Sequence, residues 1–400
     1  MKTKRITTEL NEAAALLRCG ELVAVPTETV YGLAGNGLDV SAVEAIYDVK
    51  GRPAVKPLSL MVPDQHAMEQ CCEEIPAAAH ILADRYWPGP LTIILKAKNV
   101  VPEIVRAGGK TVGLRCPDHP ATLETLRLAQ VPFAAPSANP SGEPSPKTAE
   151  DVLRYFDGKI SAVIDGGPCG IGLESTIVDL SQTPFRILRN GALPEREIWN
   201  ALIDGMTIVG ITGGTGCGKT TALHALRERG ACLLDCDEIY HYLLETNADL
   251  LSEIDSRFPG VVHDGALDRK KLGAQVFRDE TSLRDLNEIT HRYVREEVCT
   301  RLVDWAKQGE TFAAIDAIAL IESGLHEMCS TVIGVTAPRD ERIRRIMQRE
   351  GISEAYAAAR VDAQKSNEWY AEHCDQILEN NGTLDAFEAA CRKLSMEVIK

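Results

Sequence analysis

The chain has 400 residues, of which 44% are hydrophobic and 25% are charged, and its formal net charge at pH 7 is −15. This composition is that of an ordinary globular protein, and the length favours two domains because single cores stop growing beyond roughly 250–300 residues. The acidic balance argues against a general affinity for nucleic acid, and no apolar run approaches the ~20 residues that would span a bilayer.

The N-terminal stretch and the cysteines indicate a cytoplasmic protein. Residues 1–17 begin with cations but place Glu9 and Glu12 where a secretory signal needs an apolar run. The twelve cysteines are scattered and form no C-x-x-C pair, which favours reduced thiols over disulfides or zinc sites.

The first half mixes short apolar runs, such as "LTIILKA" and "STIVDL", with helical stretches and many Pro/Gly turns. Its loops also carry cations and hydroxyl groups, and one predicted strand, "TVGLR", carries Thr111 and Arg115 four residues apart and so on the same side. Each of these alone is more often solvated surface or turn chemistry. Together they suit polyphosphate and carboxylate groups, and no activated nucleophile accompanies them. The residues are Thr29, Lys50, Arg52, Thr111, Arg115, Ser137, Asn139, Ser145, Ser175 and Arg189.

Six segments of the first half follow one another in a recognisable order: "PTETVYGL", "KGRP", "WPGPLT", "PSANPSG", "SPKTAEDV" and "ESTIVDL". Over residues 6 to about 198 this pattern resembles the threonylcarbamoyl-AMP synthases of the YrdC-like family. The resemblance implies an enzyme that joins L-threonine, bicarbonate and ATP into L-threonylcarbamoyl-AMP and pyrophosphate. The product would feed modification of the tRNA adenosine beside the anticodon, which is an indirect link to tRNA modification proteins.

The resemblance also implies a role for each matching residue. L-Threonine would be held by Thr29, Arg115 and Ser175. ATP would be held by Lys50, Arg52, Lys56, Thr111, Ser137, Asn139, Ser145 and Arg189. Two positions depart from the family: Lys56 stands where some members have Asn, and Met61 where some have a threonine-contacting His. The source of threonine selectivity therefore stays open.

A domain boundary is predicted at residue 205. The segment "RILRNGALPEREIWNALIDG" ends the first half with a turn and a short helical pattern that starts at Pro194. A buried-strand pattern, "MTIVGIT", then begins a new unit. We expect domains at residues 1–205 and 206–400, joined by a short connection.

The second half opens on a phosphate-binding loop. Gly213-x4-Gly218-Lys219-Thr220 follows the strand "TIVGIT" and precedes the helix "TTALHALRERG", whose N-terminus favours phosphate. Lys219 can reach the transferred phosphoryl group and Thr220 can hold Mg²⁺. The predicted ATP contacts of this loop are Gly213, Gly214, Thr215, Gly216, Cys217, Gly218, Lys219, Thr220 and Thr221. Cys217 lies beside Lys219 and a helix N-terminus, a setting that favours the reactive thiolate.

A second strand, "ACLLDCDEIY", carries Asp235 and Asp237, which would project to one side if the strand continues. One of them can instead cap the following helix, and we assign that alternative to Asp235. Adjacent carboxylates near a phosphate loop can take a hydroxyl proton or hold Mg²⁺ through water.

Residues 206–400 resemble dephospho-coenzyme A kinase, through "GITGGTGCGKTT", "GACLLDCDEIYHYLL", "LDRKKLGAQVF", "DAIALIESGLH" and "RIRRIMQREGIS". The resemblance implies transfer of the ATP γ-phosphoryl group to the ribose 3′-hydroxyl of dephospho-CoA. Asp237 would be the general base, and Arg345 and Arg349 would lie on the lid, with Arg349 favoured for charge stabilisation. Asn380 matches the adenine-side turn. His291 lacks the following Pro of the family, and its role stays open.

The fold expected throughout is α/β: a twisted mixed sheet in the first domain, and a parallel sheet with a helical lid in the second. Both sites would use ATP with Mg²⁺, with no membrane association and no stable nucleic-acid binding. Other functions stay open. The first half could be an RNA-binding module or could form carbamoyl-AMP, and the second could be a nucleoside monophosphate kinase. The lack of interleaved aromatic and basic residues counts against the RNA-binding function.

Overall fold

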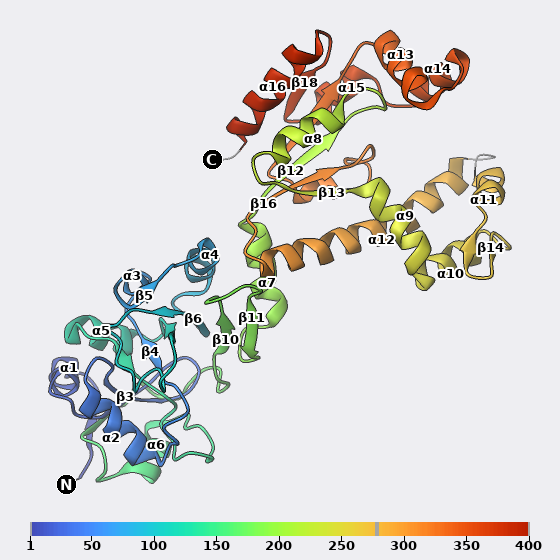
Figure 1. The fold of residues 1–400 in the computed structure, drawn as a ribbon. Helices are drawn as coiled ribbons and strands as arrows, with labels where there is room; N and C mark the ends of the chain where they lie inside the picture. Colours follow the sequence, from blue (N-terminus) through green and yellow to red (C-terminus); the bar gives the residue numbers. More distant parts are fainter. Residues whose placement is uncertain (1, 277–279, 399–400) are drawn as a thin grey trace. The chain divides into compact units, whose positions relative to one another are not determined.

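A computed structural model describes residues 2–276 and 280–398 of the chain. The chain divides into two compact units: the first runs to Gly205 and includes Lys307–Gly309, and the second starts at Met206. Figure 1 draws the first unit in blue to green and the second in green to red. In the part of the chain that the structure describes, no helix is both long and apolar enough to cross a membrane.

The described residues of the first unit form one mixed sheet of eleven strands, as the sequence predicts for the fold class. The strand order is β1-β9-β2-β3-β8-β4-β7-β6-β10-β11, with β5 paired to β6. The strands are β1 (Lys4–Ile6), β2 (Val23–Val25), β3 (Gly32–Asn36), β4 (Ser59–Met61), β5 (Cys72–Glu73), β6 (Leu91–Ala97), β7 (Thr111–Arg115), β8 (Phe133–Ala134), β9 (Ala162–Ile164), β10 (Thr176–Asp179) and β11 (Arg186–Arg189).

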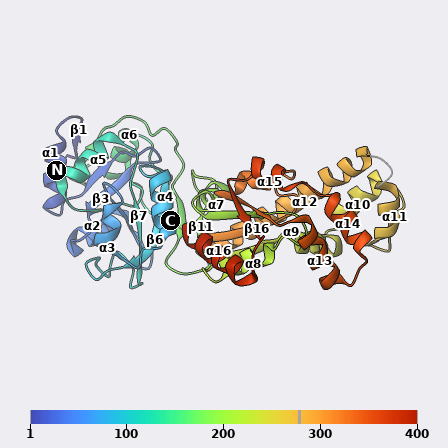
Figure 2. The same ribbon diagram turned by 90° about the horizontal axis from the view of Figure 1, so that it is seen from above.

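Helices cover this sheet with their apolar faces. They are α1 (Leu10–Arg18), α2 (Val40–Lys50), α3 (His66–Cys71), α4 (Ala77–Tyr86), α5 (Pro120–Ala129), α6 (Ala149–Phe156) and α7 (Glu195–Asp204). Helices α1 and α5 lie side by side in both views (Figures 1 and 2), above a core that includes Leu17, Val23 and Phe133. Helix α6 begins at a capping box, in which the side chains of Thr148 and Asp151 each accept the other residue's backbone N–H.

The second unit is built on a five-stranded parallel sheet in the order β13-β16-β12-β17-β18, again as predicted. A separate two-stranded sheet pairs β14 with β15. The strands are β12 (Thr207–Thr212), β13 (Cys232–Asp235), β14 (Val262–His263), β15 (Ala266–Leu267), β16 (Phe312–Asp316), β17 (Thr331–Thr336) and β18 (Gln376–Glu379). The helices are α8 (Lys219–Arg227), α9 (Cys236–Thr246), α10 (Ala248–Arg257), α11 (Arg269–Val276), α12 (Glu280–Lys307), the 3₁₀ helix η1 (Leu325–Met328), α13 (Arg339–Glu350), α14 (Glu354–Asp362), α15 (Asn367–His373) and α16 (Leu384–Glu397).

The core of the second unit lies between this sheet and the neighbouring helices α8 and α16 (Figure 1), and it includes Ile211, Leu226 and Phe387. Helices α13 and α14 pack on each other through a small apolar cluster of their own, which contains Ile346 and Val361. Because the two helices share this cluster, they pack as one hairpin, which lies in the segment where the sequence predicts a helical lid.

One strand is shorter than the sequence suggests. β13 ends at Asp235, and helix α9 begins at the next residue, because the Asp235 carboxylate accepts the backbone N–H of Asp237 at 2.8 Å and of Glu238 at 3.1 Å. The expectation that Asp235 and Asp237 project to one side of a continuing strand is therefore wrong. The alternative, that Asp235 caps the helix, is confirmed.

Candidate active sites

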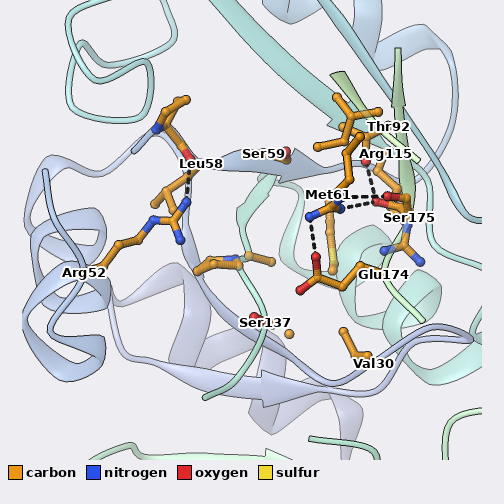
Figure 3. Close-up of a pocket in the computed structure, with 16 residues that line it drawn as sticks. Val30, Arg52, Leu58, Ser59, Met61, Thr92, Arg115, Ser137, Glu174 and Ser175 are labelled. Carbon is orange, nitrogen blue, oxygen red and sulfur yellow. Dashed lines mark hydrogen bonds and ion pairs between the residues drawn. The ribbon is translucent and has the colours of Figure 1, made fainter. Parts of the chain in front are cut away.

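Several strand ends meet at one edge of the first unit's sheet and surround a pocket (Figure 3). β4 and β7 run parallel and end together, with Met61 opposite Arg115. β6 runs opposite to β7 and is parallel to β10, so Ser175, which precedes β10, lies beside the start of β6. β11 returns antiparallel to β10 and brings Arg189 to the same edge. Sheet topology thus gathers residues that are far apart in the sequence.

Arg115 is held on three sides and is only 7% exposed. Its Nε donates to the carbonyl of Gly89 at 3.3 Å, and its Nη2 donates to Thr29 Oγ1 at 2.8 Å and to Glu28 Oε1 at 2.6 Å. Within the described chain, Nη1 makes no hydrogen bond, and Arg115 lines the pocket. One nitrogen of a fixed guanidinium is therefore left for a carboxylate ligand.

Ser175 and Arg189 form a second fixed group at the pocket edge. Ser175 Oγ lies 2.9 Å from Thr92 Oγ1 and accepts from Arg189 Nη2 at 3.1 Å. Arg189 Nε donates to the Ser175 carbonyl at 2.9 Å, and its Nη1 pairs with Glu174. Ser145 Oγ donates to the same carboxylate at 3.2 Å, so Glu174 links two of the residues predicted to hold ATP.

Lys50 ends α2, and Arg52 follows two residues later at the pocket. Lys50 is 3% exposed, and its ammonium group donates to the carbonyls of Ser137 and Asn139, which ties α2 to the Pro-rich loop. Burial lowers the pKa of Lys50 to about 8. Arg52 donates to the carbonyl of Pro57 at 2.9 Å and lines the pocket, as does Ser137.

Six of the predicted ligands lie outside the pocket lining: Lys50 and Ser145, whose contacts are given above, and four others. Thr29 is fully buried behind Arg115. Asn139 is 6% exposed, and its Oδ1 has no hydrogen-bond partner in the described chain. Lys56 is exposed, and Thr111 stands at the opposite end of β7, opposite Lys96 of β6. The ligand contacts of all the predicted residues, inside the pocket lining or outside it, remain predictions.

Two carboxylates of this pocket region were not predicted from the sequence. Glu28 and Glu174 both adjoin assigned residues, in "PTETV" and "GLEST", and each now pairs with an arginine of the site. An acid beside a hydroxyl in a loop rich in assigned cations was the available signal.

In the second unit, the loop between β12 and α8 adopts a conformation that requires glycine. Gly213, Gly216 and Gly218 have φ of 141°, 81° and 109°. A Cβ on Gly213 would lie 2.2 Å from the carbonyl oxygen of Val335. Lys219 begins α8, so the loop presents a helix N-terminus to an anion, and Thr220 and Thr221 occupy the first turn.

Side chains from the lid and the C-terminal segment hold this loop from outside. Arg342, 4% exposed, donates from Nε to the carbonyl of Thr215 at 3.0 Å. Gln364 accepts from the backbone N–H of Thr215 at 2.9 Å and donates to its hydroxyl at 2.9 Å. Asn380 donates to the carbonyl of Cys217 at 2.9 Å and accepts from Arg345 at 3.2 Å. Arg342 and Gln364 were not predicted as loop contacts.

Carboxylates stand at the carboxyl ends of neighbouring strands. Asp316 ends β16 opposite Asp235 of β13, and its Oδ1 lies 3.9 Å from Lys219 Nζ without a hydrogen bond in the described chain. Burial raises the pKa of Asp316 to about 6, with Asp235 and Asp237 adding to the shift and Lys219 opposing it. Asp316 was not predicted from the sequence, although an acidic residue directly after the apolar run "FAAI" is typical of a strand end.

Asp237 is exposed on the first turn of α9 and borders a pocket between α9, α12 and the segment after β16. Tyr240, Thr290, His291 and Ile318 line the same pocket. Burial lowers the pKa of His291. His291 therefore belongs to the wall of a pocket next to Asp237.

Two expectations differ from the structure or lack support in it. Arg349 is exposed and pairs with the adjacent Glu350 at 2.6 Å, whereas Arg345 donates to the carbonyl of Gly216 at 3.3 Å. The preference for Arg349 over Arg345 thus has no contact behind it in this conformation. Cys217 is 1% exposed, and burial raises its pKa, so the expected thiolate character is wrong.

These features define the class of protein: an α/β unit with an arginine-lined pocket, followed by a phosphate-loop kinase unit. A family model of the Sua5, YciO and YrdC proteins, described as "Telomere recombination", matches residues 15–191, and a model described as "Dephospho-CoA kinase" matches residues 207–386. The chain belongs to both families, the first half to the YrdC-like threonylcarbamoyl-AMP synthases and the second half to the dephospho-CoA kinases.

Individual relatives agree with this assignment. The threonylcarbamoyl-AMP synthase of Pyrococcus abyssi is 49% identical over 186 residues, which are 46% of this chain and 55% of that protein. A Mycobacterium tuberculosis relative is 35% identical over 200 residues, 50% of this chain and 91% of its own length. The dephospho-CoA kinase of Anaeromyxobacter dehalogenans is 38% identical over 191 residues, 47% of this chain and 90% of its own. The chain thus spans little more than half the length of the Pyrococcus relative.

Proposed function

We propose that the chain is a bifunctional cytoplasmic enzyme. Residues 1–205 would make L-threonylcarbamoyl-AMP and pyrophosphate from L-threonine, bicarbonate and ATP, for tRNA modification, and residues 206–400 would phosphorylate dephospho-CoA with ATP. The observation that supports the first activity best is the convergence of Arg52, Arg115 and Arg189 on one pocket. For the second it is the phosphate loop, with Asp237 facing a neighbouring pocket.

The synthase chemistry needs two anions held together. The ammonium group of threonine passes a proton to bicarbonate, which gives carbon dioxide and water. The free amine then adds to carbon dioxide and releases one proton, which gives a carbamate. A carbamate oxygen bonds to the α-phosphorus while the bond to pyrophosphate breaks. The free Nη1 of Arg115 suits the threonine carboxylate, and Arg52 and Arg189 suit the triphosphate. Fixed cations offset the mutual repulsion of these anions, so catalysis here is positional and electrostatic.

The kinase chemistry needs a base for the acceptor hydroxyl and cations for the transferred group. Asp237 would take the hydroxyl proton, while Lys219 and Arg345 stabilise charge on the phosphoryl group. Arg349 would serve the same purpose only after the lid has moved. Among the described residues, no three His, Cys, Asp or Glu side chains converge on one metal position. The hydroxyl of Thr220 and the unpaired oxygen of Asp316 fit an oxygen-ligated ion, and would hold Mg²⁺, which neutralises phosphate charge when bound.

Separate assays on the purified chain test both halves. We expect pyrophosphate release from ATP that requires both L-threonine and bicarbonate, and CoA formation that requires dephospho-CoA. Salt-dependent tRNA binding without threonine-dependent pyrophosphate release would favour the RNA-binding alternative for the first half. Faster phosphorylation of a nucleoside monophosphate than of dephospho-CoA would replace the kinase assignment.

A further inference from the structure

Glu174 is the single carboxylate among the described residues that line the first unit's pocket, whose other charged side chains are Arg52, Arg115 and Arg189. Figure 3 shows its side chain extending between the labelled Met61 and Val30. An anion in a pocket otherwise built for anions requires an explanation, because it repels the polyphosphate that the arginines attract.

The backbone of Glu174 is anchored, whereas its carboxylate can change partners. Its carbonyl accepts the backbone N–H of Ala192 at 2.9 Å, which anchors the residue to the turn after β11. The side chain is 39% exposed and pairs with Arg189 and Ser145. Both partners are predicted ATP contacts. A triphosphate that binds them displaces Glu174 and leaves its charge without a partner.

An amino-acid substrate supplies the missing cation. Its carboxylate finds the free Nη1 of Arg115, but its α-ammonium group needs an acceptor, and arginine side chains accept nothing. Glu28 is committed to Arg115 and to the backbone N–H of Asp118 at 3.0 Å, and it does not line the pocket. Glu174 is therefore the anionic acceptor in the pocket lining that remains for the α-ammonium group.

We propose that Glu174 binds the α-ammonium group of the amino-acid substrate, and that it moves there from Arg189 and Ser145 when the substrates enter. The inference rests on the proposed synthase function. Each ligand frees the group that the other needs: the ammonium draws Glu174 away from the phosphate-binding residues, and the triphosphate releases Glu174 toward the ammonium. L-Threonine and ATP therefore bind with positive coupling, and by linkage each raises the affinity for the other equally.

The experiment compares two ligands that differ only in the ammonium group. Titration calorimetry on the full chain measures L-threonine against (2S,3R)-2,3-dihydroxybutanoate, in which a hydroxyl replaces the amine. We expect wild type to prefer L-threonine by roughly ten- to a hundredfold, the size of one charge-assisted hydrogen bond. Glu174→Gln loses most of that preference, Glu174→Asp keeps part of it, and Glu73→Gln, at an exposed position of β5, keeps all of it.

Coupling is read from the threonine titration alone, with and without α,β-methylene-ATP, so nucleotide bound at the kinase site does not disturb the readout. Wild type should gain affinity for L-threonine with the nucleotide, and Glu174→Gln should gain little. If Glu174→Gln still prefers L-threonine over the dihydroxybutanoate as strongly as wild type does, the proposal is overturned. An equal loss of affinity for both ligands also overturns it. A Glu174→Gln variant that alters only the Mg²⁺ requirement for nucleotide would make Glu174 a metal ligand instead. Absence of L-threonine binding and of threonine-dependent pyrophosphate release in wild type would reject the synthase function itself.

Discussion

Oε1 of Glu28 lies 2.6 Å from Nη2 of Arg115, and the two side chains are only 13% and 9% exposed. Removing one partner leaves the other charge buried and unpaired, which typically costs about 3–5 kcal/mol. We expect Glu28→Ala to destabilise the first unit by that order and to accelerate native-state hydrogen exchange of the β7 amides. Glu12→Ala, which breaks the exposed Lys4–Glu12 pair, should cost about 0–1 kcal/mol. If Glu28→Ala and Glu12→Ala lost the same stability, the Glu28–Arg115 pair would not be a buried ion pair.

Each unit has its own set of residues proposed to bind phosphate, so the two sites should work independently. Lys219→Ala removes the cation that lies beside Gly213 and Asp316. We expect CoA formation to fall by about 10²-fold or more, because a charge stabiliser in phosphoryl transfer is lost. Threonine-dependent pyrophosphate release should stay near the wild-type rate. Loss of both activities in a folded variant would show that the sites are coupled.

Substitutions of Asp235, which ends β13, and of Asp237 should have different effects on turnover and on stability. Asp237→Asn keeps the size of the side chain but removes the proposed base, so turnover should fall by about 10²-fold or more with ATP affinity retained. Asp235→Ala removes the N-cap of α9, which typically costs about 1 kcal/mol of stability. Steady-state kinetics and urea unfolding distinguish the two. A larger turnover loss from Asp235→Asn, which still can cap, would exchange their roles.

Much of the second site is local in sequence, which explains why it could be predicted. The strand, the glycine turn and the helix that begins at Lys219 follow one another directly, and glycine is the residue that positive φ demands. The contacts of Arg342 and Gln364 with Thr215 span 127 and 149 residues, and nothing in the local pattern indicates which arginine of the lid helix faces the loop.

The pocket of the first unit depends more on sheet topology than the phosphate loop of the second unit does. Thr111 and Arg115 share one strand, and their spacing predicts a common face, but only the end of β7 reaches the pocket. Which strand ends meet is decided by pairing order, as when β11 returns Arg189 to the start of β10. Glu174 was not predicted because its contacts with Arg189 and Ser145, and its place in the pocket lining, depend on how the chain folds.

Burial makes Cys217 the wrong target for thiol reagents. The residue is 1% exposed and burial raises its pKa, so a reagent reaches the sulfur poorly and little of the thiol ionises to thiolate. We expect iodoacetamide at neutral pH to modify the exposed Cys19 and leave Cys217 intact, with kinase activity retained. Peptide mass spectrometry follows each site. Alkylated Cys217 that appears together with lost activity, and that ATP prevents, would restore the reactive-thiol hypothesis.

Asp316 should give the kinase unit a pH-dependent stability. Burial raises its pKa from 3.8 to about 6, so the folded state binds this proton more tightly than the unfolded state does. The resulting contribution to stability is complete below about pH 4 and is lost as pH rises through 6. Between pH 5 and 7 it falls by about 1 kcal/mol. Asp316→Asn cannot titrate, so its free energy of unfolding relative to wild type should rise by that amount over this range. Urea unfolding at pH 5, 6 and 7, without nucleotide, measures the difference. Asp340→Asn, at a side chain that is 96% exposed, is the matched control and should run parallel to wild type. Parallel curves for Asp316→Asn as well would show that this carboxyl titrates normally in the folded chain.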